Sequence, residues 1–300
     1  MTDMKGSITL LCPRCRRVLG QATHLPSACP GCGLEFPRLR GCPVLREVPA
    51  GEQLDLSASP GLPSQNSAHL PIPFVRQALG SDGLVLELGA GVDSCTHPGL
   101  VKTDAYLYSP QLDYVVDAHR LPFQDDTFDF VYSLAVFEHL HSPWIAAGEI
   151  WRVLKPGGQV YTLCAFFQHV HGYPDHYFNI TESGLRRLFA QFEIVDCGPS
   201  PFSPLEQIGV SLMDLKEMVQ ALRAQRRAFA NATANVRDVA ALESHLHEVI
   251  QLVVKLQRDL IQPPAARAAW RRIAPGFELI ARKPLADQLA HPTFDRAAYD

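Results

Sequence analysis

The sequence has no long hydrophobic run. No stretch approaches the roughly 18 uninterrupted apolar residues that a membrane-spanning helix needs, and the first ten residues, MTDMKGSITL, lack the apolar run of a secretory signal. Internal repeats and low-complexity tracts are also missing. We therefore expect a cytoplasmic protein without a membrane partner. With 47% hydrophobic and 19% charged residues among 300, the chain can bury one substantial core and carry a small accessory module.

The chain also lacks an excess of basic residues. Lys and Arg number 27 against 31 Asp and Glu, which gives a formal net charge of −4 at pH 7. Enzymes that act on nucleic acids usually present a basic surface, so this balance argues against RNA or DNA as the substrate of the main part of the chain. The exception is residues 1–50, where Lys and Arg outnumber the acids. Only this segment could offer a basic patch to a nucleic acid.

Four of the eight cysteines follow a regular spacing, and the other four are scattered. Cys12 and Cys15 form one C-x2-C pair, and Cys29 and Cys32 form a second pair further along the chain. In a reducing compartment such a pattern indicates metal binding, not disulfides. Each pair can direct two thiolates at one ion, and four thiolates complete the closed tetrahedral shell of a structural zinc site. We therefore predict a Zn2+ ion that stabilises a module too small to fold on its core alone.

Short apolar runs rich in β-branched residues alternate with amphipathic segments through the middle of the chain. The runs have strand length, and they are GLVLELGAG, LVKTDAY, LDYVVDA, FDFVYSLA, GGQVYTLCAF, FEIVDCG and GFELIARK. Helical patterns lie between the fourth and fifth runs (WIAAGEIWRVL) and before the sixth (TESGLRRLFAQF). Alternation of this kind predicts an α/β fold, in which helices cover a mainly parallel sheet of seven strands.

Residues 205 to 262 follow a different pattern. Apolar residues recur there at three- and four-residue spacing over two long segments, which predicts two helices packed as an antiparallel pair. The last apolar run, at 276 to 283, returns the chain to the sheet. The helical pair could form a lid over a substrate or join two copies of the chain as a homodimer, and the spacing does not choose between these roles.

These changes of pattern divide the chain into five parts. Composition marks residues 49 to 67 as a Pro-, Gly- and Ser-rich linker, and the last residues have the composition of a loose tail. The predicted parts are a zinc ribbon at 1–48, a linker at 49–70, the main domain at 71–204 and 274–284, a helical insertion at 205–273, and a tail at 285–300.

The strongest local signal for a ligand site is the motif Glu87-Leu88-Gly89-Ala90-Gly91 at the end of the first apolar run. Glycines are needed where a strand turns sharply and its backbone must approach a ligand at the carboxyl edge of a parallel sheet. Asp104 ends the second run, where an acid can accept hydrogen bonds from ribose hydroxyls. A glycine turn alone is also an ordinary connection, so the weight lies on the ordered motifs that follow it.

Those motifs resemble the class I S-adenosylmethionine-dependent methyltransferases, in the branch called type 11. The shared elements are the E/D-x-G-x-G turn, D-A-x-x-L-P-F from Asp117, F-D-x-V from Phe128, the pair Glu138-His139, and L-K-P-G-G from Leu154. The resemblance covers about residues 71 to 200 and the strand at 276 to 283. It implies a Rossmann-like sheet with an antiparallel last strand, and S-adenosylmethionine as the cofactor.

The resemblance also implies which residues surround this cofactor. The glycine turn would hold its methionine portion and approach the ribose, Asp104 would take the ribose hydroxyls, and Asp117 with Ala118 would meet the adenine edge. The next strand would line the pocket beneath the sulfonium. The predicted cofactor-binding residues are Glu87, Gly89, Ala90, Gly91, Asp104, Asp117, Ala118, Ser133, Leu134, Ala135 and His139. For Asp117 the alternative is a capping role in a turn, and for His139 it is the closing of the turn after the fourth strand.

The sequence departs from the family pattern at one place. Only twelve residues separate Gly91 from Asp104, and they include Pro98 and Gly99. We therefore expect the usual helix after the glycine turn to be very short or absent. A degenerate, non-catalytic member of the family would show the same abbreviation.

A loop rich in His, Tyr and Asp follows the fifth predicted strand, on the side where acceptors bind. The stretch from His169 to Tyr177 reads HVHGYPDHY, and its composition is hard to explain by packing. Methyl transfer is an in-line displacement in which positioning supplies most of the acceleration, and a base near neutral pKa helps a hydroxyl acceptor. Our candidates for base or acceptor binding are His171, His176 and Asp175, with local hydrogen bonding as the alternative.

The acceptor itself is open at this point. Residues 36 to 45, FPRLRGCPVL, resemble the ending of short zinc ribbons that accompany methyltransferases, with Cys42 in place of an apolar residue. We expect a small-molecule or glycan acceptor, methylated on oxygen or nitrogen. The alternatives are an rRNA or tRNA methyltransferase, whose zinc modules usually end differently, and a non-catalytic partner protein that binds another enzyme through the ribbon and the helical pair.

Overall fold

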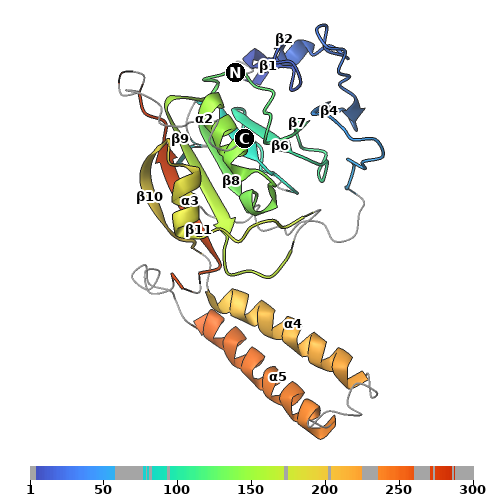
Figure 1. Ribbon diagram of the computed structural model, residues 1–300, viewed down its shortest axis with the longest axis vertical. Coiled ribbons are helices and arrows are strands. Elements are labelled where there is room, and N and C mark those ends of the chain that lie inside the picture. Colours follow the sequence, from blue (N-terminus) through green and yellow to red (C-terminus); the bar gives the residue numbers. More distant parts are fainter. Residues whose placement is uncertain are drawn as a thin grey trace.

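The computed structural model of the chain describes residues 5–57, 77–78, 80, 83–92, 95–171, 175–201, 204–224, 236–259, 271–272, 274–285 and 287. Its centre is a large twisted sheet with helices packed against it, and two long helices project from one end of this body (Figure 1). Among the residues described, no helix combines the length and the apolar character that crossing a membrane requires.

Nine strands form the large sheet, in the order β10-β11-β9-β8-β5-β6-β7-β4-β3. In chain order they are β3 (Arg38–Leu39), β4 (Cys42–Leu45), β5 (Val85–Leu88), β6 (Leu100–Asp104), β7 (Tyr114–Val116), β8 (Phe128–Leu134), β9 (Leu154–Ala165), β10 (Glu193–Pro199) and β11 (Gly276–Arg282). Strands β4 to β9 run parallel to one another, whereas β3 is antiparallel to β4 and β11 is antiparallel to both β9 and β10. The seven predicted strands are β5 to β11, so the mainly parallel α/β sheet and its antiparallel last strand are confirmed.

Two further strands come from the segment that we assigned to the zinc ribbon. Val44 and Leu45 in β4 pair in parallel with Val115 and Val116 in β7, and β3 pairs with β4. The sequence pattern did not predict this extension of the sheet. Cys42 is buried at the start of β4 among apolar residues, and burial raises the pKa of its thiol to about 11. It therefore fills the core.

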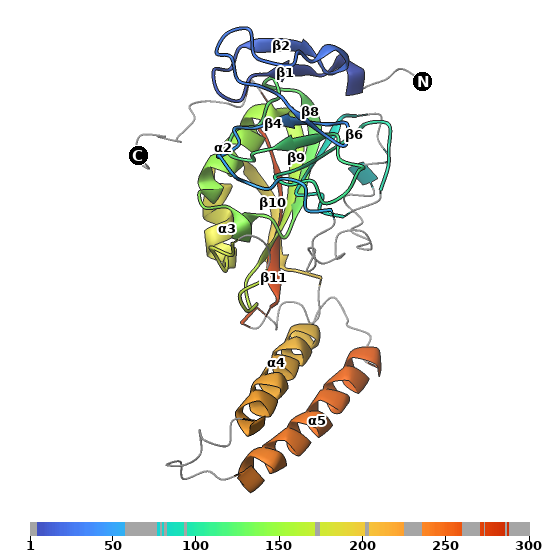
Figure 2. The same ribbon diagram turned by 90° about the vertical axis from the view of Figure 1, so that its right-hand side faces the viewer.

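The cysteine-bearing segment packs directly on the sheet. It consists of η1 (Lys5–Ser7), the hairpin β1 (Thr9–Leu11) and β2 (Val18–Gln21), and η2 (Ala22–His24). Leu10 forms an antiparallel bridge with Phe123, and the N–H of Leu11 donates to the carbonyl of Pro122 at 2.9 Å. Buried residues of the segment belong to the same hydrophobic core as those under the sheet. The predicted zinc ribbon therefore shares its core with the main domain (Figure 2).

The predicted linker is in part a packed segment. Within residues 49–70 the structure describes 49–57, where Leu54 and Leu56 are buried. The N–H of Leu56 donates to the carbonyl of Leu107 at 3.0 Å, and the N–H of Leu107 donates to the carbonyl of Leu54 at 2.8 Å. The remainder of this range, 58–70, lies outside the described residues, as does most of the predicted tail.

Two helices cover one face of the sheet. These are α2 (Pro143–Val153) and α3 (Glu182–Leu188), which lie side by side on that face (Figure 2). Proline at the first turn suits α2, because its missing N–H would have no helical partner there. Helix α3 begins where the Thr181 side chain accepts the N–H of Gly184. Ala146, Ala147 and Ile150 of α2 are fully buried, so this face of the sheet is closed to solvent.

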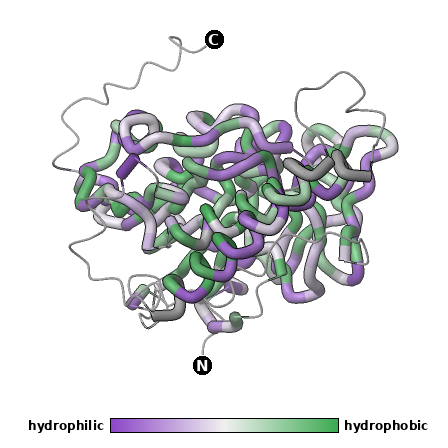
Figure 3. Tube along the Cα trace, turned by 90° about the horizontal axis from the view of Figure 1, so that it is seen from below, coloured by the Kyte–Doolittle hydropathy of each residue, from purple (hydrophilic) through white to green (hydrophobic). Residues whose placement is uncertain are grey.

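The predicted pair of helices is present as α4 (Pro204–Ala224) and α5 (Val236–Asp259). Gln220 donates to Glu243 at 2.9 Å, and one turn away Lys216 contacts His247 at 3.3 Å. The two helices are therefore antiparallel. Figure 3 looks along the molecule from this end, and apolar and polar residues alternate on the coils in the foreground. Large apolar side chains stay exposed on the pair, among them Leu242, Val249 and Leu252 of α5. Whether these helices join two copies of the chain or cover an acceptor stays a prediction.

Candidate cofactor and acceptor site

The carboxyl ends of the parallel strands meet at one edge of the sheet, and the predicted site residues gather there. Strand β5 lies between β6 and β8, so the strand order reverses direction at β5. In open parallel sheets such a reversal leaves a crevice beyond the strand ends in which ligands bind. The residues at this edge come from the ends of β4, β5, β6, β7 and β8 and from the loop after β9.

The turn after β5 is built for a close approach of backbone. Gly89 and Gly91 have φ of +72° and +54°, in the left-handed region that favours glycine. The N–H groups of Gly89 and Ala90 both donate to the carbonyl of Thr103, at 2.9 and 3.0 Å. A Cβ at Gly89 would overlap the side chain of Val136. The turn is therefore held in a shape that a larger residue would disturb, with the buried side chain of Glu87 just before it.

Asp104 fastens this turn to the end of β6. Its Oδ2 accepts the N–H of Gly91 at 2.9 Å, and its Oδ1 accepts the N–H of Tyr106 at 3.2 Å. Burial raises the pKa of Asp104 from 3.8 to about 6, although backbone N–H groups act in the opposite direction. Each carboxylate oxygen can accept two hydrogen bonds. Asp104 therefore retains acceptor capacity for the hydroxyls of a ribose.

Asp117 lies at the end of the neighbouring strand β7, with its side chain 43% exposed. Its Oδ1 accepts the N–H of His119 at 2.9 Å and lies 2.7 Å from Nδ1 of the same histidine. Burial acts to raise the pKa of Asp117, but the contacts with His119 outweigh burial and hold the pKa below its ordinary value. This is the geometry of a turn cap, and it also keeps a carboxylate at the edge. Ala118 is partly buried beside it.

The end of β8 contributes further residues to this edge of the sheet. The hydroxyl of Ser133 is buried and lies 2.9 Å from the hydroxyl of Thr162 in β9, so it is engaged within the sheet. Leu134 is partly buried and Ala135 is exposed. Ala135 has φ of +54°, a conformation that residues with a Cβ rarely adopt. The chain thus turns sharply at Ala135, and Val136 is placed against the glycine turn.

The abbreviated segment after the glycine turn contains no helix in the part that the structure describes. Residues 91–92 and 95–99 form turns and irregular backbone, and β6 begins at Leu100. The expectation of a missing helix holds for these residues.

Three residues at this edge were not among those predicted from the sequence. Because β4 is parallel to β7, the residue after it, Arg46, reaches the same edge as Asp104. The guanidinium of Arg46 donates to the carbonyl of Ala105 at 3.0 Å, pairs with Glu52 and lies over the ring of Tyr106. Glu52 in turn accepts the hydroxyl of Tyr106 at 3.0 Å. Local sequence carried no signal for this cluster, because it depends on the pairing of β4 with β7.

A second group of side chains lies beyond β8, where η4 (Phe137–His139) meets the loop after β9. The peptide N–H groups of Tyr177 and Phe178 donate to the carbonyl of Glu138, at 2.8 and 3.2 Å. This brings together His139, His171 and His176, whose ring centroids lie 4.5 to 5.7 Å apart. Burial lowers the pKa of both His139 and His171. These imidazoles are therefore held in the neutral form that a base or a ligand requires.

Of the loop residues that we predicted, His171 lies nearest to the buried part of the edge. Asp175 is exposed, its Oδ2 accepts the hydroxyl of Tyr177 at 3.0 Å, and its carbonyl lies 2.7 Å from Nδ1 of His139. His176 has both ring nitrogens in local contacts, with the N–H of His171 at 3.2 Å and with the carbonyl of Phe178 at 3.1 Å. The structure brings all three candidates to one end of η4, and their roles stay predictions.

Glu138 was noted only as part of the Glu138-His139 motif and not as a site residue. Its side chain is completely buried, and neither carboxylate oxygen has a hydrogen-bond partner in the described part of the chain. Burial raises its pKa to about 7. Its position in η4, four residues after the end of β8, was the available signal.

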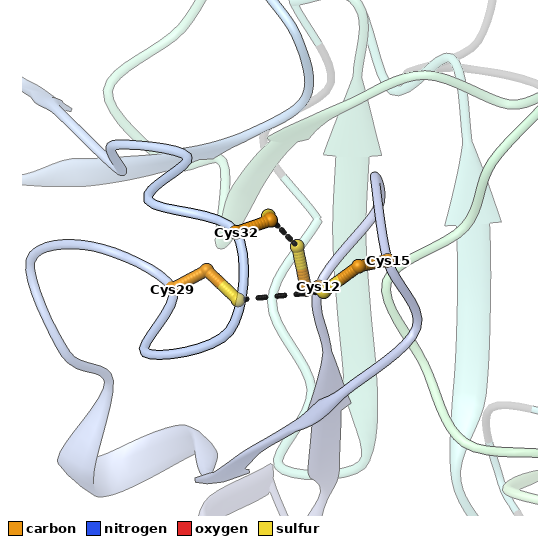
Figure 4. Close-up of side chains that lie close together, drawn as sticks. All are labelled: Cys12, Cys15, Cys29 and Cys32. Carbon is orange, nitrogen blue, oxygen red and sulfur yellow. Dashed lines mark hydrogen bonds between the residues drawn. The ribbon is translucent and has the colours of Figure 1, made fainter.

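The four patterned cysteines form a separate cluster about the hairpin (Figure 4). Their sulfur atoms all lie within 4.8 Å of one another, with 3.6 Å between Cys12 and Cys32 and between Cys15 and Cys29. In a tetrahedral zinc–thiolate site the sulfurs are about 3.8 Å apart, given a Zn–S bond of about 2.3 Å. The separations are far too long for disulfides. The donor set and its spacing therefore fit a zinc ion.

The two cysteine pairs sit in equivalent turns. The N–H of Cys12 donates to the carbonyl five residues on, at 2.8 Å, and the N–H of Cys29 does the same at 2.8 Å. The fourth residue after each has a left-handed backbone, Arg16 with φ of +62° and Gly33 with φ of +74°. The C-x2-C spacing thus predicted two matching knuckles correctly. Arg16 also donates to the carbonyl of Leu121 at 2.9 Å, which ties the first knuckle to the sheet domain.

The edge of the sheet fits S-adenosylmethionine by its donor and acceptor groups. The glycine turn has the left-handed backbone that a close approach of a ligand to the main chain requires, and two carboxylates stand at the ends of the next two strands. Such carboxylates match the hydroxyl and amine donors of a nucleoside.

Comparison with known proteins supports the same class. Residues 92–162 match the family model described as a methyltransferase domain. A stretch of 92 residues is 36% identical to the ubiquinone/menaquinone biosynthesis C-methyltransferase of Roseobacter denitrificans and covers 30% of this chain and 35% of that protein. A stretch of 100 residues is 33% identical to the demethylmenaquinone methyltransferase of Streptomyces griseus, covering 28% and 43%. The chain therefore spans less than half of the length of these curated relatives.

Two solved structures with a similar course of the chain are distant. The cyclase SpnF has a TM-score of 0.41 and 19% identity, over 71% of this chain and 80% of that chain. Phosphoethanolamine N-methyltransferase 2 of Haemonchus contortus, in complex with S-adenosylhomocysteine, has a TM-score of 0.39 and 16% identity, over 75% and 54%. These likenesses are too distant to bear on function. The matched segment and the observed α/β fold together support a class I S-adenosylmethionine-dependent methyltransferase.

Proposed function

We propose that this protein transfers the methyl group of S-adenosylmethionine to the oxygen or nitrogen of a small-molecule or glycan acceptor. The observation that carries the proposal is the hydrogen bond from the Gly91 N–H to Asp104. This bond fixes the glycine turn beside a carboxylate that can accept hydrogen bonds, at the point where the strand order reverses. The segment match to a methyltransferase domain supports it independently.

The cofactor would lie across the ends of β5 to β8. Glu87 with the turn of Gly89, Ala90 and Gly91 would hold the methionine portion, and Asp104 would bind the ribose hydroxyls. Asp117 and Ala118 would contact the adenine edge. Leu134, Ala135 and the backbone at Ser133 would lie beneath the sulfonium, with His139 close by. Bound there, S-adenosylmethionine supplies a methyl carbon already activated for attack.

The loop after β9 forms the acceptor side of this proposed site. Transfer requires the acceptor atom, the methyl carbon and the sulfur to lie in line, and a hydroxyl or ammonium acceptor must also lose a proton. His171, His176 and Asp175 lie at the correct edge of the sheet for taking that proton or binding the acceptor. The named relatives methylate carbon according to their names, so a carbon acceptor is the second outcome to be tested.

The charge distribution of the N-terminal segment supports a small acceptor over a nucleic acid. Its basic side chains lie largely in ion pairs with acids of the same fold, as in the pairs Lys5 with Asp113 at 2.9 Å and Arg40 with Asp55 at 2.8 Å. Arg14 and Arg46 pair in the same way with Glu47 and Glu52. A phosphate backbone would have to compete with these acids.

We propose further that Cys12, Cys15, Cys29 and Cys32 hold one zinc ion with a structural role. Four thiolates fill the tetrahedral shell and leave no position for water or substrate. The ion would stabilise the hairpin against the sheet domain.

Calorimetric titration with S-adenosylmethionine and S-adenosylhomocysteine tests the proposed function. We expect both to bind the wild-type chain, and Asp104→Ala to weaken binding by about 1 to 3 kcal/mol, because buried hydroxyls lose their acceptor. Asp129→Asn is the matched control, since Asp129 pairs with Lys155 at the opposite edge of the sheet. Absence of binding by a folded wild-type chain would leave the non-catalytic partner protein as the correct assignment.

A further inference from the structure

The carboxyl group of Glu138 is an unusual buried acid. Its side chain has 0% exposure, and both of its oxygens lack a hydrogen-bond partner among the residues that the structure describes. Buried carboxylates in proteins are paired, hydrogen-bonded or bound to a metal, because isolated burial is expensive. The surroundings of Glu138 therefore bear directly on what satisfies this group.

Two imidazoles face this carboxylate. Nε2 of His171 lies 4.0 Å from Oε1 of Glu138, and ligand atoms of Glu138, His139 and His171 all lie within 4.8 Å of one another. These residues come from η4 and from the loop after β9, segments that are joined by the hydrogen bonds of Tyr177 and Phe178 to the Glu138 carbonyl. The three side chains are thus held together by backbone contacts and not by bonds among themselves.

The hydrogen bonds of the two imidazoles decide which nitrogen is available. Nδ1 of His139 lies 2.7 Å from the carbonyl of Asp175, and Nδ1 of His171 lies 2.8 Å from the carbonyl of His169. A carbonyl oxygen only accepts, so each Nδ1 carries the proton and each Nε2 keeps its lone pair. Histidines that bind metals are oriented in this way, with the second ring nitrogen donating to a carbonyl or a carboxylate. His176 differs, because both of its ring nitrogens are already in hydrogen-bonding contacts.

We propose that Glu138, His139 and His171 bind one divalent metal ion, separate from the four-cysteine cluster. Two imidazoles and one carboxylate suit Mn2+, Fe2+, Co2+ or Zn2+, whereas Mg2+ and Ca2+ prefer oxygen ligands throughout. Bonds of about 2.1 Å place ligand atoms about 3.0 to 3.4 Å apart. The ligand atoms now lie within 4.8 Å of one another, with 4.0 Å between His171 and Glu138, so they must approach by about one ångström, which rotation of the side chains can provide.

Three protein ligands leave coordination positions open for an acceptor. The ion would lie beside the cofactor, because Val136, two residues before Glu138, packs against Gly89. A hydroxyl bound to the ion releases its proton to water, its oxygen bonds to the methyl carbon, and the carbon–sulfur bond breaks with its electron pair on sulfur. The products are the methylated acceptor and S-adenosylhomocysteine. This role rests on the proposed function, whereas the binding of the ion does not.

Manganese titration tests the site on the full chain. Mn2+ prefers oxygen and nitrogen donors to thiolates, so a metal-depleted sample in which the cysteine cluster is refilled with zinc should bind one further ion. Free Mn2+ is followed by its electron paramagnetic resonance signal. Glu138→Gln keeps the size of the side chain and should weaken Mn2+ binding at least about tenfold, as should His171→Asn. His169→Asn is the control from the same loop, because its side chain is exposed and points to Asp214.

The outcomes separate the two proposals. Failure of the wild-type chain to bind Mn2+, or equal Mn2+ affinity in folded Glu138→Gln, overturns the metal site. Melting curves establish whether each variant is folded. If Glu138→Gln does not fold, the Mn2+ affinity of His171→Asn decides whether the metal site exists. S-adenosylhomocysteine binding, measured on the same samples, reports on the proposed function alone. We expect Glu138→Gln to bind S-adenosylhomocysteine within about twofold of the wild type, because only the acceptor side loses its ligand.

Discussion

The N–H of Gly91 donates to Oδ2 of Asp104 at 2.9 Å, and this bond joins the turn after β5 to the end of β6. The Asp104 carboxylate thereby holds the turn in shape and can also accept hydrogen bonds from a ligand. Its protonation state should consequently affect both the stability of the fold and the affinity for the cofactor.

Cofactor binding should weaken in mild acid. Burial raises the pKa of Asp104 to about 6 in the free protein, and hydroxyl donors of a ribose favour the ionised form. Asp104 is about one-tenth ionised at pH 5 and about nine-tenths ionised at pH 7, so the affinity should be about tenfold lower at pH 5. Calorimetry of S-adenosylhomocysteine across this range measures the effect. Asp104→Asn should bind weakly with no such dependence, and an unchanged slope in this variant would assign the proton elsewhere.

The same pKa has the opposite sign for folding. The folded state binds the Asp104 proton more tightly than the unfolded state, whose pKa is near 3.8. The contribution to stability is therefore present below about pH 4 and is lost as the pH rises through about 6. Denaturant unfolding of Asp104→Asn against the wild type at pH 5 and pH 7 measures it. The variant should gain stability relative to the wild type as the pH increases.

Gly89→Ala should abolish cofactor binding and lower the free energy of unfolding only moderately. The left-handed backbone disfavours alanine by about 1 to 2 kcal/mol, and the added Cβ would overlap the side chain of Val136. Gly148→Ala is the matched control, since a Cβ in α2 would meet nothing within 4 Å. We expect that control to be neutral or stabilising by up to about 1 kcal/mol. Titration and melting of the two variants together distinguish the site effect from a general effect of the substitution.

Removal of zinc should destabilise the whole domain and not the hairpin alone. The hydrophobic core of the cysteine segment is continuous with that of the sheet. Unfolding of the cysteine segment would therefore expose apolar surface on the sheet as well as on the segment. Chelation, or Cys12→Ser, should lower the melting temperature by about 10 °C or more, because each kcal/mol corresponds to about 2 to 4 °C in a chain of this size. Cys197→Ser, in β10, gives the comparison for a buried thiol outside the cluster. If chelation left the melting temperature unchanged, the cysteine cluster would not hold a stabilising zinc ion.

Arg46→Ala should destabilise the chain by about 1 to 3 kcal/mol and weaken cofactor binding. The Arg46 side chain is 11% exposed, and its removal leaves the carbonyl of Ala105 without this donor and Glu52 with the hydroxyl of Tyr106 but without its guanidinium partner. Arg14→Ala provides the comparison, because the pair of Arg14 with Glu47 lies in solvent and should contribute little. Unfolding curves in urea and titration with S-adenosylhomocysteine would show the difference.

The sheet and the cysteine cluster could be predicted from the sequence because both depend on short-range patterns. The alternation of apolar runs with amphipathic segments predicted seven strands and the helices between them in the observed order along the chain. The C-x2-C spacing predicted two equivalent turns. The motifs at strand ends likewise located Asp104 and Asp117, since parallel strands deliver their carboxyl ends to one edge.

The residues that were missed depend on contacts between distant segments. Arg46 reaches the edge only because β4 pairs with β7, some 70 residues further along the chain. Glu138 meets His171 through the loop after β9, whose Tyr177 and Phe178 N–H groups donate to the Glu138 carbonyl. No local periodicity encodes either contact, so Arg46 counted only as a positive charge and Glu138 only as the neighbour of His139.

The pairing of β4 with β7 has a consequence for shortened forms of the protein. A chain that began after β4 would keep every residue of the matched stretch 92–162. It would also leave β7, with Tyr114, Val115 and Val116 all buried in the intact fold, as an uncovered apolar margin with free peptide groups. Such a margin is a template for the strands of other molecules. A truncated domain should therefore aggregate, even though its cofactor motifs are complete.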